Sequence, residues 1–199
     1  MARPYLNKTD RKKMLLDTAA SIVDKRGWGA LSMITLAEKA SVSRQLLYQN
    51  FKSVGQLTEN TADYMFEDLY SATQAVLSDN DNDIIKAIRE AQAVLLTFPP
   101  GRVQALWNII SHNSFKEQHF AKISRRFRRL ISNLYTPHIM KLMNLDKKQA
   151  GQTAWLLMMS FWGAQQLVND KSISIEDAST LITSHVEWIV LGRKAQSNR

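Results

Sequence analysis

Residues 32–52 read SMITLAEKASVSRQLLYQNFK, and this stretch decides the fold. Its apolar residues recur at spacings of three and four, which predicts two short amphipathic helices over residues 32–39 and 43–50. The apolar residues of each helix share one side: Met33, Leu36, Ala37 and Ala40 in the first, and Val42, Leu47 and Phe51 around the second. Two short helices joined by so short a turn have the proportions of a helix-turn-helix.

The outward side of the second helix carries side chains that suit base reading. Arg44 can pair with guanine through two hydrogen bonds, Gln45 can do the same with adenine, and an exposed Leu46 can pack on a thymine methyl group. Serines stand at both helix starts, where a hydroxyl caps the helix and free backbone N–H groups can hold a phosphate. The predicted DNA-binding residues are Ser32, Thr35, Ser43, Arg44, Gln45, Leu46, Tyr48, Gln49, Asn50 and Lys52, with Tyr48 and Lys52 assigned to phosphates.

With Leu15–Ala20 and Gly27-Trp28 ahead of it, this stretch resembles the N-terminal domain of the tetracycline-repressor (TetR-like) family over about the first 60 residues. Three positions depart from the family pattern: Ser41 replaces the turn glycine, Asn50 replaces an aromatic residue or histidine, and Val54 replaces a lysine. The resemblance implies a homodimer whose two recognition helices read a pseudo-palindromic operator in double-stranded DNA. It also implies that the C-terminal helices form the dimer interface and an effector pocket.

The rest of the chain also predicts helices, because it has few Gly and Pro residues and shows no alternating strand pattern. We expect an all-α fold of about nine helices, with a three-helix DNA-binding domain over residues 1–53 and a ligand-binding and dimerisation bundle over 54–199. The first expected helix runs from Thr9 or Asp10 to Arg26, and a longer one runs from Val54 to Leu77. Two more are separated by the break at Pro99-Pro100-Gly101: one begins at Ile84 and ends at this break, and the next continues to about His112. The last three run from Lys116 to about Leu142 with a bend or end near Pro137, from Asp146 to Asn169, and from Ser174 to a stop at Gly192.

The C-terminal helices hold the candidate ligand and dimer residues. The segment 154–168 is apolar nearly all round, so it must be buried on more than one face, and a partner subunit would supply the second cover. Gln165 is a polar residue in that setting and needs a hydrogen-bond partner. The ligand candidates are Trp107, Phe115, Met158, Phe161, Trp162 and Gln165, and the dimer candidates are Trp155, Met159, Leu181 and Trp188. Ordinary core packing is the alternative for the apolar members of both sets.

The formal net charge of +8 is concentrated in two places. Residues 1–55 carry a net +6 and residues 116–141 another +6, so the remainder of the chain is net acidic. The first basic segment coincides with the helix-turn-helix. The second contains Arg125-Arg126-Phe127-Arg128-Arg129, which is either an anion-binding site or a solvated helix face.

Several classes of function are excluded or disfavoured. With no cysteine the chain cannot form disulfides or thiolate metal sites, and its four histidines show no metal-binding spacing. No cofactor, metal or catalytic motif is predicted, so we expect a protein that is not an enzyme. The longest apolar run, 154–164, is too short to span a bilayer, and the basic N-terminus lacks the apolar region of a secretory signal. We therefore expect a cytoplasmic protein without membrane contact.

These observations predict a ligand-responsive transcriptional regulator that binds DNA. We expect a repressor that a small apolar or aromatic effector releases from its operator. The alternative is an effector-independent DNA-binding or nucleoid-associated interaction protein. A helical enzyme with a basic substrate site is the third reading, and the absence of any paired acid and base or nucleophile motif disfavours it.

Overall fold

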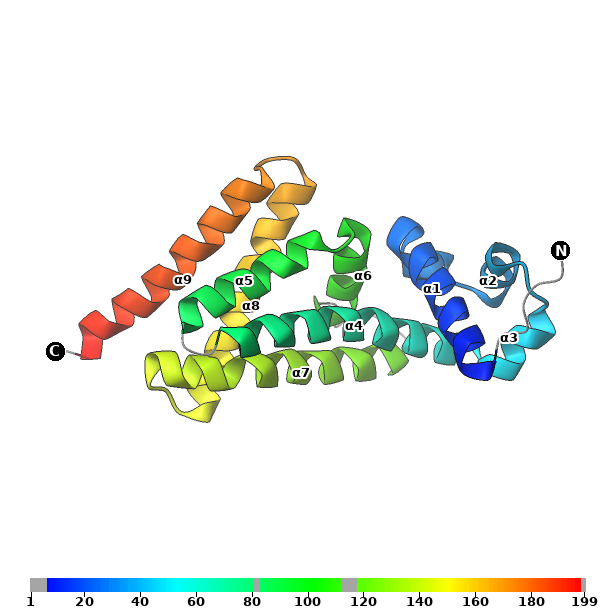
Figure 1. Cartoon of the computed structure of the whole chain (residues 1–199), viewed down its shortest axis with the longest axis horizontal. Helices are drawn as coiled ribbons and strands as arrows, with labels where there is room; N and C mark the ends of the chain where they lie inside the picture. Colours follow the sequence, from blue (N-terminus) through cyan, green and yellow to red (C-terminus); the bar gives the residue numbers. More distant parts are fainter. Residues whose placement is uncertain (1–6, 81–82, 112–117, 198–199) are drawn as a thin grey trace. The chain divides into compact units, whose positions relative to one another are not determined.

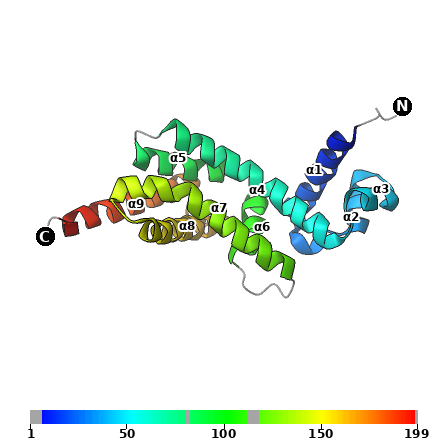
Figure 2. The same ribbon diagram turned by 90° about the horizontal axis from the view of Figure 1, so that it is seen from below.

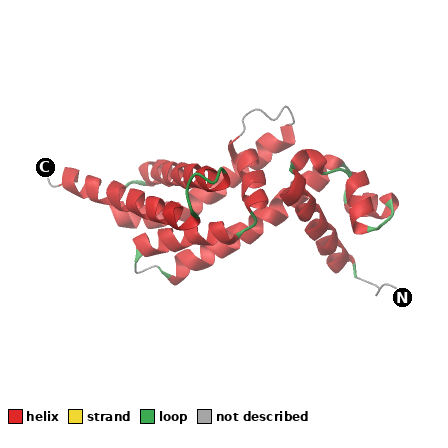
Figure 3. Ribbon diagram, turned by 90° about the horizontal axis from the view of Figure 1, so that it is seen from above, coloured by secondary structure: helices red, strands yellow, loops and turns green. Residues whose placement is uncertain are grey.

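The computed structural model describes residues 7–80, 83–111 and 118–197, and this part of the chain is helical without a strand (Figure 3). The expectation of an all-α protein is confirmed. Its elements are α1 (Lys8–Arg26), a 3-10 helix η1 (Trp28–Ala30), α2 (Met33–Ala40), α3 (Arg44–Asn50), α4 (Val54–Asp79), α5 (Ile84–Thr97), α6 (Pro100–Ser111), α7 (Gln118–Met143), α8 (Lys147–Asn169) and α9 (Ile175–Ser197).

Polar side chains fix several helix starts. The Oδ1 atom of Asn7 accepts a hydrogen bond from the Asp10 backbone N–H at 2.9 Å, so α1 begins at Lys8, slightly earlier than predicted. The predicted cap at Asp146 is confirmed, since its carboxylate accepts from the Gln149 N–H at 2.8 Å. The predicted start at Ser174 is confirmed as well, because Ser174 and Asp177 each accept a hydrogen bond from the backbone N–H of the other.

One predicted helix end is wrong. Gly192 does not end α9, which continues to Ser197, since one glycine inside a helix costs only about 1 kcal/mol relative to alanine. α7 continues through Pro137 to Met143, which agrees with the expected end at about Leu142. Tyr135 and Ile139 are buried on either side of the proline, and their packing holds the helix together through it.

The chain forms two compact units. The first contains Met1–Asp68 and Pro99–Ser124, and the second contains Leu69–Phe98 and Arg125–Arg199. The boundary expected after residue 53 separates a DNA-binding domain from a ligand-binding and dimerisation domain. The compact units instead divide inside α4, and the first unit also contains α6. The assignment of residues 54–199 to ligand binding and dimerisation stays a prediction.

The core of the first unit positions the helix-turn-helix. In this unit α1 packs against α2, η1 and α6, and α2 packs against α3. Leu15 of α1, Leu36 of α2, Leu47 of α3 and Phe51 directly after α3 are fully buried. Burying one such side chain stabilises the folded state by about 1.5–3 kcal/mol. The apolar sides predicted for both motif helices therefore meet in one core, which leaves the opposite side of α3 to the solvent.

The second unit is a helical bundle. Figure 1 shows α8 and α9 as an antiparallel pair, joined by a turn at which Lys171 has a positive φ of 58°. α9 also packs against α5, and Figure 2 shows the same helices from below. α8 lies close to α7 at Gly151, where a Cβ atom would come within 3.3 Å of the Ser132 hydroxyl.

The ranges that the structure describes contain no helix that is both long enough and apolar enough to cross a membrane.

Candidate nucleic-acid interface

The turn between α2 and α3 is tight and left-handed at one residue. Ser41 has φ 52° and ψ 49°, a conformation that glycine adopts most easily. The N–H of Val42 donates to the carbonyl of Ala37 at 3.0 Å, and the N–H of Ser41 donates to the carbonyl of Glu38 at 3.2 Å. These hydrogen bonds end α2 and direct the chain into α3, so serine takes the place of the expected glycine at some conformational cost.

The second helix of the motif, α3, starts at a serine cap and presents polar side chains on one side. The Ser43 hydroxyl accepts a hydrogen bond from the Leu46 N–H at 3.2 Å. Arg44, Gln45, Tyr48 and Gln49 are exposed, whereas Leu47 is fully buried. One helix side therefore holds the core while the opposite side offers hydrogen-bonding groups suited to base edges and phosphates.

Two of the predicted DNA-binding residues differ from expectation in their surroundings. Leu46 is half-buried, not fully exposed, because its position on α3 lies at the edge of the core side. The side chain of Asn50 donates from Nδ2 to the Leu46 carbonyl at 2.8 Å, so this amide group caps the last turn of α3. Ser32 caps α2 as predicted, with its hydroxyl 3.0 Å from the Thr35 N–H.

A second capping arrangement, which the sequence reading missed, holds the backbone at Lys52. The Ser53 hydroxyl accepts from the Gln56 N–H at 3.1 Å, and the Gln56 side chain accepts from the Lys52 N–H at 2.6 Å. The spacing Ser-x-x-Gln is a capping signal that was present in the sequence. Because Lys52 is exposed and its backbone is held, its ammonium group is available for a phosphate.

The exposed surface of the motif also includes large apolar side chains. Tyr48 of α3, Ile34 of α2 and Val54 of α4 are among the exposed large apolar residues of the chain. Ile34 was not among the predicted site residues. An exposed apolar group here suits contact with thymine methyl groups or sugars.

Salt bridges and hydrogen bonds join α1, α4 and α6 behind the motif. Arg102 of α6 pairs with Asp24 of α1 at 3.1 Å and with Asp68 of α4 at 3.0 Å. The indole N–H of Trp28 donates to the carbonyl of Ala105 in α6 at 2.8 Å. The start of α6 therefore belongs to the support of the DNA-binding helices.

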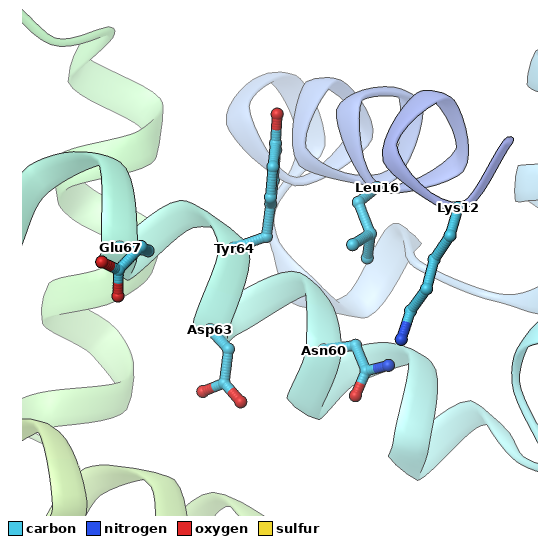
Figure 4. A pocket seen from close by; sticks show the side chains of 6 residues that line it. All are labelled: Lys12, Leu16, Asn60, Asp63, Tyr64 and Glu67. Carbon is cyan, nitrogen blue, oxygen red and sulfur yellow. The ribbon is translucent and has the colours of Figure 1, made fainter. Parts of the chain in front are cut away.

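Between α1 and α4 lies an open pocket of about 400 Å³ (Figure 4). Its lining residues are Lys12 and Leu16 of α1 and Asn60, Asp63, Tyr64 and Glu67 of α4. The hydroxyl of Tyr64 donates to the Asp17 carboxylate, and this hydrogen bond, with burial, raises the pKa of Tyr64 to about 12. The two carboxylates in the lining disfavour the binding of a DNA phosphate at this place.

Comparison with known proteins agrees with this geometry. Residues 15–59 match the family described as bacterial regulatory proteins, tetR family. The matched segment contains the cores of α1, α2 and α3, the turn at Ser41 and the cap of α4. The helix-turn-helix segment of the chain is therefore similar to the DNA-binding part of TetR-family transcriptional regulators, and the chain is TetR-like in this sense. No curated protein sequence matches it.

Solved structures share the fold of this TetR-like chain over almost its whole length. A TetR-like transcriptional regulator from Rhodococcus sp. RHA1 is 20% identical, with a TM-score of 0.73 over 94% of this chain and 100% of its own. A transcriptional regulator from the same organism is 16% identical, with a TM-score of 0.75 over 91% and 96%. A TetR transcriptional regulator from Legionella pneumophila is 14% identical, with a TM-score of 0.69 over 92% and 99%.

The candidate ligand residues of the TetR-like chain lie in different parts of the structure. Met158, Phe161, Trp162 and Gln165 are buried in α8, and the Gln165 Oε1 atom has no hydrogen-bond partner among the described residues. Trp107 is half-buried in α6, which belongs to the first compact unit. Phe115 lies outside the described residues.

The candidate dimer residues are uncovered to different degrees. Trp155 and Met159 of α8 are half-buried, and Leu181 of α9 is exposed. Trp188 of α9 is 73% exposed, which is high for so large an aromatic side chain. Leu156 and Leu167 of α8 are also exposed and were not predicted, because the sequence alone does not show which side of an apolar helix faces the core.

Proposed function

We propose that this TetR-like regulator is a repressor that binds a pseudo-palindromic operator as a homodimer and is released by a small apolar or aromatic effector. The observation that carries the proposal is the outward face of α3. Arg44, Gln45, Tyr48 and Gln49 are exposed on a helix whose opposite side is locked into the core by Leu47. A recognition helix held in this way can present a fixed pattern of donors and acceptors to the major groove.

Exposed apolar side chains on α8 and α9 support the homodimer. On α8 the exposed Leu156 and Leu167 share one side with the half-buried Met159. On α9 the exposed Leu181 and Trp188 are seven residues apart and so lie on the same side. Exposed apolar side chains on a pair of packed helices are typical of a subunit interface. A symmetric dimer that reads one duplex with two recognition helices requires half-sites about 34 Å apart or a multiple of it.

Buried polar atoms without partners support an effector. Gln92 Oε1 of α5, the Tyr135 hydroxyl of α7 and Gln165 Oε1 of α8 are buried and have no hydrogen-bond partner among the described residues. Burial raises the pKa of Tyr135, so its hydroxyl stays protonated and can donate. Unsatisfied buried groups cost about 1–3 kcal/mol each. An effector with an apolar body and hydrogen-bonding groups would satisfy them.

Release follows if the effector binds one conformation better than another. α4 runs without interruption from the helix-turn-helix unit into the second unit. A change in the direction of this helix would alter the separation of the two recognition helices in the dimer. Only differential affinity of the effector for the two conformations can shift their populations.

Selection from a pool of randomised DNA duplexes tests the proposal. The expected result is an enriched site with two inverted half-sites, bound by a protein that sediments as a dimer. A small-molecule screen by thermal shift follows, and we expect it to find a compound that raises the Tm of the protein and weakens its binding to the operator. Enrichment of a single asymmetric half-site would contradict the dimeric operator, and failure of every stabilising compound to change operator affinity would favour the effector-independent alternative.

A further inference from the structure

A cluster of arginines on α7 has no role in the proposed function. Arg125 and Arg129 are exposed and Arg128 is half-buried, while Phe127 between them is buried in the core. The sequence of α7, Gln118–Met143, contains no Asp or Glu. Within the described ranges, none of the ion pairs involves Arg125, Arg128 or Arg129. We call these three residues the arginine face.

The arginine face is an unfavourable arrangement for the protein by itself. Arg125 and Arg128 are three residues apart and Arg125 and Arg129 are four apart, so the like charges are neighbours on the helix and destabilise it. Because Phe127 is anchored in the core, the helix cannot turn these residues away from one another. An external anion that neutralises the cluster removes this repulsion.

The surroundings of the arginine face favour a phosphate backbone as the partner. The described part of α7 has none of the exposed large apolar side chains, whereas protein interfaces and bilayer-binding helices both use such anchors. Three planar guanidinium groups offer paired N–H donors that match phosphate oxygens. Double-stranded DNA is a polyanion that this family of regulators already binds.

We propose that the arginine face contacts the sugar-phosphate backbone of double-stranded DNA without reading its sequence. This contact adds to the one made by α3 and requires neither an effector nor a pseudo-palindromic site, so it goes beyond the proposed function. It gives the second basic segment of the chain a binding role. Each neutralised phosphate releases counterions, so the contact makes DNA affinity more dependent on salt.

Salt titrations of the full chain on a long random-sequence duplex test this proposal. Fluorescence anisotropy gives the slope of log affinity against log salt for the wild type, for R125Q/R129Q and for the control K147Q/K148Q. The control removes the same charge from exposed residues of α8 in the same compact unit. We expect the slope of R125Q/R129Q to flatten by up to about 1.8, because each phosphate contact contributes about 0.9, while the control keeps the wild-type slope. Equal slopes for the two double variants would overturn the proposal.

Two further measurements separate a loss of charge from a loss of folding. R125K/R129K keeps the charge and is expected to retain most of the slope, while thermal melts by circular dichroism show whether each variant is folded. If R125Q/R129Q does not fold, the single variants R125Q and R129Q are each expected to flatten the slope by up to about 0.9, and unchanged slopes overturn the proposal. Unchanged DNA binding together with lost binding to phosphatidylglycerol vesicles would assign the face to a membrane and overturn it too.

The experiments can contradict the proposed function and the role of the arginine face independently of each other. R44A/Q45A removes base reading, and its binding to the random duplex is expected to remain sensitive to R125Q/R129Q. If pool selection returns no operator, the proposed function fails while the slope measurement still decides the role of the arginine face.

Discussion

Arg102 Nη2 lies 3.1 Å from Asp24 Oδ2, in a salt bridge between residues that are 78 positions apart in the chain. Both side chains are mostly buried, with exposed fractions of 17% and 15%. The other guanidinium nitrogen, Nη1, reaches Asp68 at 3.0 Å. Arg102 of α6 therefore links the end of α1 to the middle of α4. These two helices flank the helix-turn-helix, α2 and α3, in the sequence.

Replacing Arg102 is expected to destabilise the protein more than replacing Asp68. Arg102→Ala leaves the Asp24 carboxylate partly buried without its partner, and we expect the free energy of unfolding to fall by about 2 kcal/mol. The Asp68 side chain is 42% exposed, so Asp68→Asn is expected to cost less than about 1 kcal/mol. Urea denaturation measures both values. Equal losses of unfolding free energy in the two variants would show that burial of the Arg102–Asp24 salt bridge is not the source of the stability that Arg102 contributes.

Gly101 is expected to tolerate no side chain. A Cβ atom at this position would lie 1.8 Å from the Asp24 backbone oxygen, so Gly101→Ala must push α6 away from α1. We expect a loss of about 1–3 kcal/mol, as for other overpacked sites. Gly29→Ala is the matched control, because a Cβ there meets nothing within 4 Å. Thermal unfolding of the two variants checks the prediction, which fails if they melt together.

Alkaline titration is expected to reveal the hydrogen bond from Tyr64 to Asp17. The hydrogen bond to the Asp17 carboxylate raises the pKa of Tyr64 to about 12 from the usual 10.0. Since the folded pKa lies above the unfolded value, the stabilisation is fully present below pH 10 and is lost as the pH rises through about 12.

Difference spectra of tyrosinate absorbance, taken between the wild type and Tyr64→Phe, isolate the titration of Tyr64. Asp17→Asn is expected to return this titration toward pH 10, because it removes the charged acceptor. A midpoint that does not move in Asp17→Asn would contradict the assignment.

Polar replacements on α9 are expected to break the proposed dimer. Leu181→Ser/Trp188→Ser removes two exposed apolar side chains, and since Trp188 is 73% exposed in one subunit, the monomer itself loses little packing. We expect analytical ultracentrifugation to show a dissociation constant raised at least about 100-fold, a change of about 2.7 kcal/mol. Ile34→Ser, at an exposed apolar site in the helix-turn-helix, is the control and keeps the dimer. A dimer that survives the double replacement places the interface elsewhere.

Local signals in the sequence predicted local structure well. The caps at Ser32, Ser43 and Asp146 follow from the chemistry of single side chains near free N–H groups, and the structure confirms them. The buried sides of α2 and α3 follow from apolar spacing alone, because the side of each helix that carries its apolar residues, Leu36 in α2 and Leu47 in α3, is the side that faces the core.

Relationships between distant residues could not be predicted in this way. Nothing near Arg102 in the sequence indicates that its partner is Asp24, since the pairing depends on how α6 packs on α1. The half-buried state of Leu46 and the exposure of Leu156 depend in the same way on which neighbours a helix meets. The sequence predicts a helix end at Gly192, but a single glycine is a weak signal against the packing of a long helix, and α9 continues to Ser197.

The most direct test of base reading by α3 is the ratio of the dissociation constants for a scrambled duplex and for the site enriched by selection. In the wild type this ratio is expected to be large, and in Lys52→Ala it is expected to stay the same while both constants rise. In Arg44→Ala/Gln45→Ala it is expected to fall by at least about 10-fold, since each paired contact to a base contributes about 1–3 kcal/mol of discrimination. If Arg44→Ala/Gln45→Ala weakened binding to both duplexes equally and kept the ratio of the wild type, α3 would not be the element that reads the sequence.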